Sequence, residues 1–227
     1  MPSMDKKLVA VVPDVHVPDH DPEAVRWCLQ QIKHRRPGTV VLLGDVLDLT
    51  SVSRFPKSLA TKATLVSELE AGREFFSQLL SAAKDARIIY KSGNHEDRLS
   101  TYLFKAAPEL ADLPALTIPA VLKLPPRVEY VSTHHVIVDD VMVTHGRKFD
   151  GNVALANLRR YRMSVVQGHS HRMTIAYLCD ARGNLLSSAE CGTLQIKTPG
   201  YAGVTDWTHG LAWIRNGVVL LQPKEDQ

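Results

Sequence analysis

The sequence predicts one α/β domain, with a parallel sheet in its first half and hairpins in its second. Before residue 95, three apolar, β-rich runs alternate with two helical segments, which is typical of parallel strands joined by right-handed crossovers. After residue 126 the pattern changes to paired apolar runs separated by turn sequences, which is typical of antiparallel hairpins. A chain of 227 residues can bury one full core, so we expect a single domain over residues 1–227.

Local signals mark each strand and helix of the first half. Apolar runs predict strands at residues 7–12, 39–45 and 87–94. Asp21 is a typical N-cap and Pro22 suits the first helical position, so a helix is expected to begin there. We expect this helix to stop at Pro37 and Gly38, two residue types that end helices. Apolar residues at helical spacing predict a second helix within residues 61–85.

The second half contains signals for three hairpins and one further helix. Turn sequences place the hairpins at residues 139–140, 182–184 and 216–217. The Asn-Gly pair of the last turn is typical of type I′. A helix near residues 152–162 and a short strand at 164–168 are expected between the first two hairpins. The proline-rich residues 99–126 are expected to form short helices and loops that act as a cap or lid over the strand ends.

Composition and charge exclude several classes of protein. Hydrophobic residues make up 44% of the chain and charged residues 22%, which excludes a disordered or fibrous protein. The net charge of +3 is too small for a dedicated nucleic-acid-binding protein, although a local basic patch is compatible with it. Cys28, Cys179 and Cys191 are odd in number and lack CxxC spacing, so we expect free thiols. We expect a soluble, cytoplasmic protein with no membrane partner, because no apolar run has the length of a membrane span.

Polar residues gather where the predicted strands end. The first three strands are followed by Asp14 and His16, by Asp45 and Asp48, and by Asn94, His95 and Glu96, and two later strands by His145 and by His169 and His171. Taken singly, each cluster could equally be turn chemistry or structural hydrogen bonding. Carboxyl ends of parallel strands lie at one edge of a sheet, so we expect these groups to meet there. Imidazole, carboxylate and amide donors together suit Mn, Fe, Zn or Ni better than Ca or Mg.

The ordered set DxH, GDxxD, GNHE, H and GHxH resembles the five-block signature of the calcineurin-like metallophosphoesterases. The blocks run from Asp14 to His171, about 70% of the chain. The resemblance implies a four-layer sandwich of two mixed β-sheets flanked by helices, and a centre of two divalent transition-metal ions. We expect Mn²⁺, with Fe, Zn or Ni as alternatives.

The family pattern also implies a role for each residue. The metal ligands would be Asp14, His16 and His171 in one site, Asn94, His145 and His169 in the other, and Asp45 as the bridge between them. His95 would be the general acid, and Asp48 would orient it and keep it protonated. The alternative for Asp48 is a turn or N-cap residue. The two ions with two carboxylates would carry a net charge of about +2, which favours a phosphate oxygen.

Four groups near the blocks have less certain meaning. Arg98 or Arg147, together with Lys148, could supply phosphate-binding charge, or they could be ordinary surface residues. Glu96 and Asp97 are expected to be turn or helix-start residues. His134 and His135 are expected to be strand residues away from the motif ends. Residues 159–162 are expected to be a solvated helix end, with a nucleic-acid contact as the alternative.

Taken together, the sequence predicts a metal-dependent phosphoesterase in which a metal-bridging hydroxide attacks phosphorus. Leu-Thr-Ser follows Asp48 where protein Ser/Thr phosphatases have a phosphate-binding Arg, so a phosphodiesterase acting on nucleotides or nucleic acid is favoured over a phosphoprotein phosphatase. The alternatives are a phosphomonoesterase of small metabolites, polynucleotide ends or phosphoproteins, and a scaffold that has the fold without the chemistry.

Overall fold

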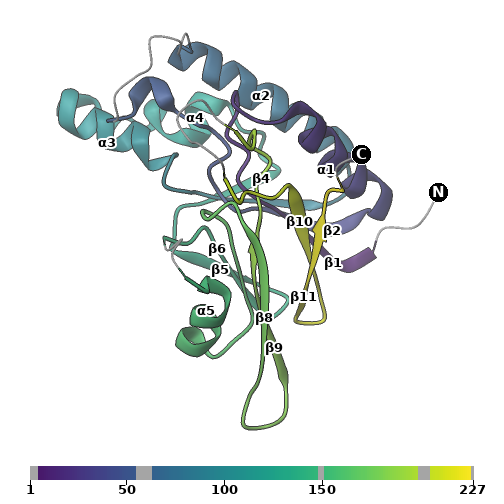
Figure 1. The fold of residues 1–227 in the computed structure, drawn as a ribbon. Coiled ribbons are helices and arrows are strands. Elements are labelled where there is room, and N and C mark those ends of the chain that lie inside the picture. The colour runs from purple at the N-terminus through teal and green to yellow at the C-terminus, as the bar shows by residue number, and fades with distance from the viewer. Residues whose placement is uncertain (1–4, 55–62, 148–150, 199–204, 226–227) are drawn as a thin grey trace.

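The computed structural model describes residues 5–54, 63–147, 151–198 and 205–225, whose strands form two mixed sheets (Figure 1). The six-stranded sheet contains, in spatial order, β11 (Val218–Pro223), β10 (Gly210–Arg215), β1 (Asp5–Val12), β2 (Pro37–Leu42), β3 (Arg87–Lys91) and β4 (Val128–Val131). The five-stranded sheet contains β5 (His135–Val138), β6 (Val141–Thr144), β7 (Val165–Gln167), β9 (Leu185–Cys191) and β8 (Met173–Cys179). Strands β1 to β4 are parallel, as are β6, β7 and β9.

Helices cover the outer face of each sheet (Figure 1). The helices beside the first sheet are α1 (Pro22–Arg35), α2 (Leu65–Ala82), α3 (Asp97–Ala106) and α4 (Ile118–Leu122). Short 3-10 turns lie at η1 (Thr50–Val52), η2 (Pro108–Leu110) and η3 (Pro114–Leu116). Helix α5 (Val153–Tyr161) packs against β7, β8 and β9. None of the helices in the described part of the chain is both long and apolar enough to cross a membrane.

Two apolar clusters hold these layers together. Ile32 of α1 and Phe76 of α2 pack with Leu42 of β2 in the cluster between the helices and the first sheet. Val41 of β2 and Val143 of β6 belong to the cluster between the two sheets. Leu42 and Val41 enter different clusters because successive side chains of a strand point to opposite faces. The predicted four-layer α/β arrangement is therefore confirmed.

The local sequence signals are largely confirmed. Asp21 Oδ1 accepts hydrogen bonds from the backbone N–H groups of Glu23 and Ala24, at 2.8 and 2.9 Å, and so caps α1. The three predicted hairpins form as β5-β6, β8-β9 and β10-β11. Two details differ from expectation. Pro37 begins β2 rather than only ending the helix, because Arg36 already turns the chain with a φ of 49°. The strand β4 was not predicted.

Residues 99–126 form most of the crossover from β3 to β4. They contain the greater part of α3, the 3-10 turns η2 and η3, and α4, as the proline-rich sequence predicts. Leu103, Ile118 and Leu122 belong to the cluster between the helices and the first sheet, and α4 contacts α2. This segment is thus part of the helical layer, and its role as a lid stays a prediction.

Candidate metal centre

The polar blocks lie at the carboxyl ends of strands from both sheets. Asp14 follows β1, Asp45 follows β2, and Asn94 follows β3, all in the first sheet. His145 follows β6 and His169 follows β7, in the second sheet. The two sheets therefore supply the centre jointly, because their parallel strands end at the same edge of the sandwich.

Asp14, His16 and His171 form one group. Donor atoms from these three residues lie within 4.8 Å of one another, and all three side chains are buried. Nε2 of His171 lies 3.2 Å from Oδ2 of Asp14, and 3.1 Å from Nε2 of His16. The structure thus brings together the residues predicted for one metal site.

A second group contains Asp45, His145 and His169, with donor atoms again within 4.8 Å of one another. Nε2 of His145 lies 3.3 Å from Oδ2 of Asp45 and 2.9 Å from Oδ1 of Asn94. The same Oδ2 of Asp45 lies 3.9 Å from Nε2 of His16, in the first group. Asp45 therefore stands between the two groups, where the bridging role predicted for it requires a carboxylate.

The donor set fits divalent transition metals. Imidazole nitrogens and carboxylate oxygens converge in each group, and these are the donors that Mn, Fe, Zn and Ni accept together. Nδ1 of His171 is buried and has no hydrogen-bond partner in the described part of the chain. Buried polar atoms are normally satisfied by a partner or a bound group. The residues present could hold two ions, one in each group, with Asp45 shared.

Opposite charges in this cluster move several pKa values. Burial raises the pKa of Asp14 and Asp45, but His145 and the other neighbouring histidines together hold both below their ordinary value. Burial lowers the pKa of His145, yet these same carboxylates raise it to about 9. Burial and the neighbouring His95 lower the pKa of His16 to about 4. His16 is therefore a neutral imidazole at neutral pH, which is the form that binds a metal.

Asp48 contacts two histidines at once. Its Oδ1 lies 3.0 Å from Nδ1 of His16 and 3.1 Å from Nδ1 of His95. Burial lowers the pKa of His95, but Asp45 and the hydrogen bond to Asp48 raise it above its ordinary value. Arg98 also reaches this pair, since its guanidinium lies 2.7 Å from Nε2 of His95 and donates to the backbone carbonyl of Asp48 at 2.7 Å. The structure thus brings together His95, Asp48 and Arg98 beside both groups of predicted ligands.

Glu96 has a structural position that the sequence did not indicate. Its buried carboxylate accepts hydrogen bonds from the backbone N–H groups of Asp45, Val46, Leu47 and Gly93, and from the hydroxyl of Tyr90. Burial and the charge of Asp45 raise the pKa of this carboxyl group, whereas its hydrogen bonds from Tyr90 and the backbone favour the ionised form. Glu96 is the N-cap residue of α3, as expected for a turn or helix-start residue, and its side chain in addition ties the loop after β2 to the loop after β3. The sequence signal was an acidic residue in the turn between an apolar strand and a helix, which by itself is common.

Backbone groups of neighbouring blocks hold the two central carboxylates. The N–H of His95 donates to Oδ1 of Asp45 at 2.8 Å, and the N–H of His169 donates to Oδ2 of Asp14 at 2.9 Å. These approaches require glycine nearby. A Cβ added at Gly93 would lie 2.1 Å from Oδ1 of Asp45, and one at Gly168 would lie 2.2 Å from Oδ1 of Asp14. The glycines of GNHE and GHxH thus leave room for the carboxylates of other blocks.

Four of the predicted ligands lie in the left-handed backbone region. Their φ values are 56° for His16, 46° for Asp45, 70° for His169 and 61° for His171. Side chains other than glycine rarely adopt this region, and each such residue costs about 1–3 kcal/mol. Strain of this kind gathers at functional sites, and in this chain helix C-caps such as Arg36 and Lys123 adopt the same region.

A basic surface borders the second group. Arg147 is exposed and lines a cavity together with His134, Asn94 and His145. The expectation that His134 lies away from the motif ends was therefore wrong, because the β5-β6 hairpin brings it back beside His145. His135 begins β5 as expected, and Lys148 lies outside the described residues. Arg159 and Arg160 are exposed in the last turn of α5, as predicted for a solvated helix end.

Comparisons of the sequence with known proteins find two relatives from mycobacteriophages. No family model matches the sequence. The Gene 54 protein of Mycobacterium phage D29 is 27% identical over 190 residues, which cover 76% of this chain and 71% of the relative. The Gene 54 protein of Mycobacterium phage L5 is 26% identical over 228 residues, covering 92% of this chain and 88% of the relative.

Among solved structures, a dimetal phosphatase from Danio rerio superposes with a TM-score of 0.50 at 12% sequence identity. The superposition covers 96% of this chain and 96% of that protein. At this level of identity the likeness concerns the fold. Two mixed sheets between helical layers, with the five blocks in order at one edge, give this chain the fold of the calcineurin-like metallophosphoesterases.

Proposed function

We propose that this protein is a metal-dependent phosphodiesterase that acts on nucleotides or nucleic acid. The observation that carries the proposal is the convergence of two groups of donors on the shared carboxylate of Asp45. His95 stands beside them, held by Asp48. This combination offers both a place for a phosphate and a proton donor next to it.

Two divalent ions bound there would lower the pKa of a water molecule and neutralise charge on the phosphoryl group. The protein's own contribution lies in holding the proton and the substrate. Asp48 keeps the Nδ1 proton of His95 in place, so Nε2 faces the reacting group. His95 would then protonate the leaving oxygen through Nε2.

Arg98 connects substrate binding to this proton. A guanidinium can only donate, so its contact with Nε2 of His95 holds while that nitrogen is unprotonated. A phosphate oxygen is a stronger acceptor for Arg98 than an imidazole. Substrate binding would draw Arg98 away and leave Nε2 free to take up the proton that it later donates.

Two observations favour a diester over a phosphoprotein substrate. Leu49 follows Asp48, so the position that carries an Arg in protein Ser/Thr phosphatases is apolar here. The exposed Asn94 also lies between two open cavities, which leaves space for a group on each side of the phosphate. A monoester needs space on one side only.

Hydrolysis of bis-p-nitrophenyl phosphate tests the proposal. Protein purified without chelator and supplied with Mn²⁺ should hydrolyse it with a higher kcat/KM than p-nitrophenyl phosphate. A preference for the monoester would contradict the diester assignment and favour a phosphomonoesterase. Fewer than one metal ion per chain, not restored by Mn²⁺, would favour a scaffold without activity.

Two variants separate the predicted roles. Asp45→Asn removes the shared charge, so metal content and activity should fall together. His95→Ala should keep the metal and lower kcat by about 10²–10⁴-fold, the usual range for a lost general acid. Metal analysis and kcat are measured on both, with His34→Ala on the exposed face of α1 as the matched histidine control. An unchanged kcat in His95→Ala would exclude His95 as the acid.

A further inference from the structure

We infer that the substrate is a single-stranded polynucleotide whose chain passes through two basic cavities on either side of Asn94. The inference rests on the proposed function and names the substrate class of the same site. Asn94 and Asp97 line both cavities, so both spaces border the predicted ligand Asn94. A chain bound in both would place one of its internal phosphates there.

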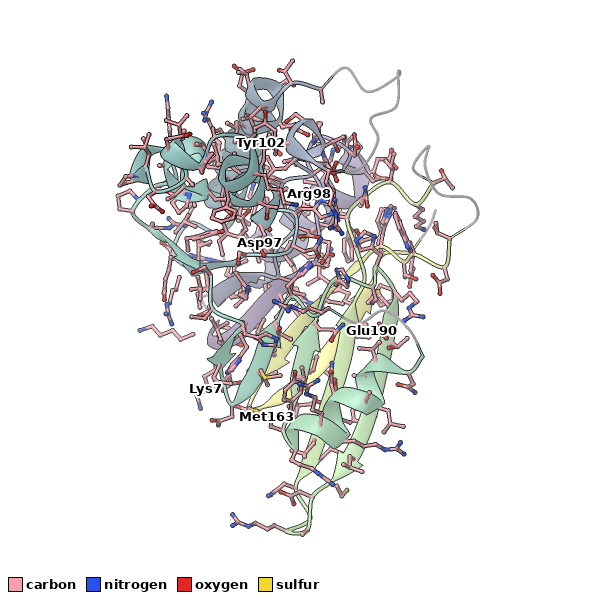
Figure 2. All side chains as sticks on the ribbon, turned by 90° about the vertical axis from the view of Figure 1, so that its left-hand side faces the viewer. Lys7, Asp97, Arg98, Tyr102, Met163 and Glu190 are labelled. Atoms are coloured by element: carbon pink, nitrogen blue, oxygen red, sulfur yellow. The ribbon has the colours of Figure 1, made fainter. Side chains whose placement is uncertain are left out.

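The first cavity lies along α3 and has a volume of about 370 Å³. Arg54, Arg98 and Lys105 bring positive charge to its lining, and Tyr102 brings an aromatic ring. Tyr102 is 48% exposed, which is unusual for a large aromatic side chain of a folded domain. Figure 2 labels Arg98 and Tyr102 close together in the upper middle of the view, with Asp97 below them. This cavity thus combines cations with a ring on which a base can stack.

The second cavity lies between the loop after β3 and the β5-β6 hairpin, with a volume of about 160 Å³. Lys91 and Arg147 supply its charge, and His134 lines it as well. The ammonium of Lys91 is buried and donates only to the carbonyl and hydroxyl of Ser92. No carboxylate in the described residues forms an ion pair with Lys91 or Arg147. Burial lowers the pKa of Lys91 and the nearby carboxylates of Glu96 and Asp97 raise it, so the exposed Arg147 is the cation that this cavity offers most directly to an anionic ligand.

The lining charges of both cavities are strongly unequal. Five Lys or Arg side chains face one carboxylate, that of Asp97, among the described lining residues. The chain as a whole carries only +3, so this is a local concentration of positive charge. A polynucleotide has a phosphate at every residue, and its flanking phosphates would meet cations on both sides of Asn94.

Shape and chemistry select a single strand over other polyanions. Cavities of these volumes admit a base or a phosphate group, and the bases of a duplex are already paired and stacked, so they are not free to stack on Tyr102. Basic grooves with exposed aromatic rings are the common means of binding single strands, because every base has a face that stacks. An acidic phosphopeptide would use the cations but would gain nothing from Tyr102.

The test compares a substrate with flanking nucleotides and one without. Kinetics are measured with single-stranded oligothymidylate and with bis-p-nitrophenyl phosphate, both with Mn²⁺. Arg147→Gln changes the second cavity, and Tyr102→Leu changes the first. Each should lower kcat/KM for the oligonucleotide about tenfold more than for the small diester, as expected for one lost charged hydrogen bond or one lost base stack. Arg182→Gln, on the exposed turn between β8 and β9, is the matched control and should change neither value.

Binding without turnover provides a second readout. Fluorescence anisotropy of labelled oligothymidylate with the protein in EDTA should show weaker binding by both variants, and weaker binding of a duplex. Equal losses for both substrates, equal affinity for the duplex, or equal competition by an acidic phosphopeptide would each overturn the inference. If wild-type protein fails to hydrolyse bis-p-nitrophenyl phosphate but the variants still lose oligonucleotide affinity, the proposed function fails while the inferred binding path stands.

Discussion

His145 must lose a proton before its nitrogen can bind a metal. Burial lowers its pKa, but Asp45 and Asp14 raise it to about 9, which is above the ordinary value of 6.5. In the metal-free protein, these contacts stabilise the fold fully below pH 6.5, and the stabilisation is lost as the pH rises through 9. Metal binding has the opposite dependence, since a metal competes with that proton.

We therefore expect the affinity for Mn²⁺ to rise with pH between 6.5 and 8.5. One displaced proton gives an increase of about tenfold per pH unit below the pKa. Isothermal titration calorimetry in buffers of different ionisation enthalpy measures the number of protons released. Binding without proton release would contradict the protonation assigned to His145.

At the residue scale, the sequence predicted which side chains come together better than it predicted what surrounds each of them. The predicted ligands come together because each follows a strand, and the ends of these strands lie at one edge of the sandwich. The apolar runs of the sequence already indicate where those strands end. The hydrogen-bond partners of Glu96 and the position of His134 were missed for one physical reason. Glu96 is positioned by backbone N–H groups of a distant loop, and His134 by a hairpin that folds back on the centre. Neither contact leaves a pattern in the local sequence.

At the element scale, the turns that follow the strands restrict which residue can stand at a position as strictly as the strands do. Gly168 directly follows the short strand β7, and a methyl group there would overlap the carboxylate of Asp14. Gly168→Ala should therefore displace Asp14 and lower the metal content, mainly in the group formed with His16 and His171. Metal analysis by mass spectrometry measures the loss.

The control for this variant is Gly183→Ala in the β8-β9 turn. Nothing lies within 4 Å of the added methyl group there, although a φ of +82° makes the variant strained. It should reduce stability and keep its metal. Full metal content in Gly168→Ala would show that the loop after β7 can move without disturbing Asp14.

Elements were predicted well where their signals are local. The N-cap and proline of α1, and the turn sequences of the hairpins, act over a few residues and leave a clear pattern. The sheet that each hairpin joins could not be predicted in this way. β10-β11 joins the first sheet through β1, whereas β8-β9 joins the second through β7. Alternating apolar residues indicate a buried face but not which sheet edge receives it.

At the scale of the whole molecule, the centre joins two sheets that are otherwise held by the apolar cluster between them. Asp14 and Asp45 follow strands of the first sheet, and His145 and His171 belong to the second half of the chain. An ion bound by both sets binds only the folded arrangement. It should raise stability by about 2.7 kcal/mol at a free concentration of 100 times its Kd.

Thermal unfolding measures this coupling. Mn²⁺ should raise the Tm of the wild-type protein, and EDTA should reverse the shift. Asp45→Asn should have a Tm that does not respond to Mn²⁺, because the shared ligand is gone. A wild-type Tm that is the same with Mn²⁺ and with EDTA would contradict a centre that links the sheets.

The left-handed backbone of His16, Asp45, His169 and His171 has an evolutionary consequence. Glycine adopts this region without strain, so a lineage that no longer needed the ions could replace these residues and gain folding stability of about 1 kcal/mol at each position. The change from an enzyme to an inert scaffold would then increase the free energy of unfolding. Selection for stability alone would therefore favour glycine at these four positions, and only a function of the side chains themselves would oppose that replacement.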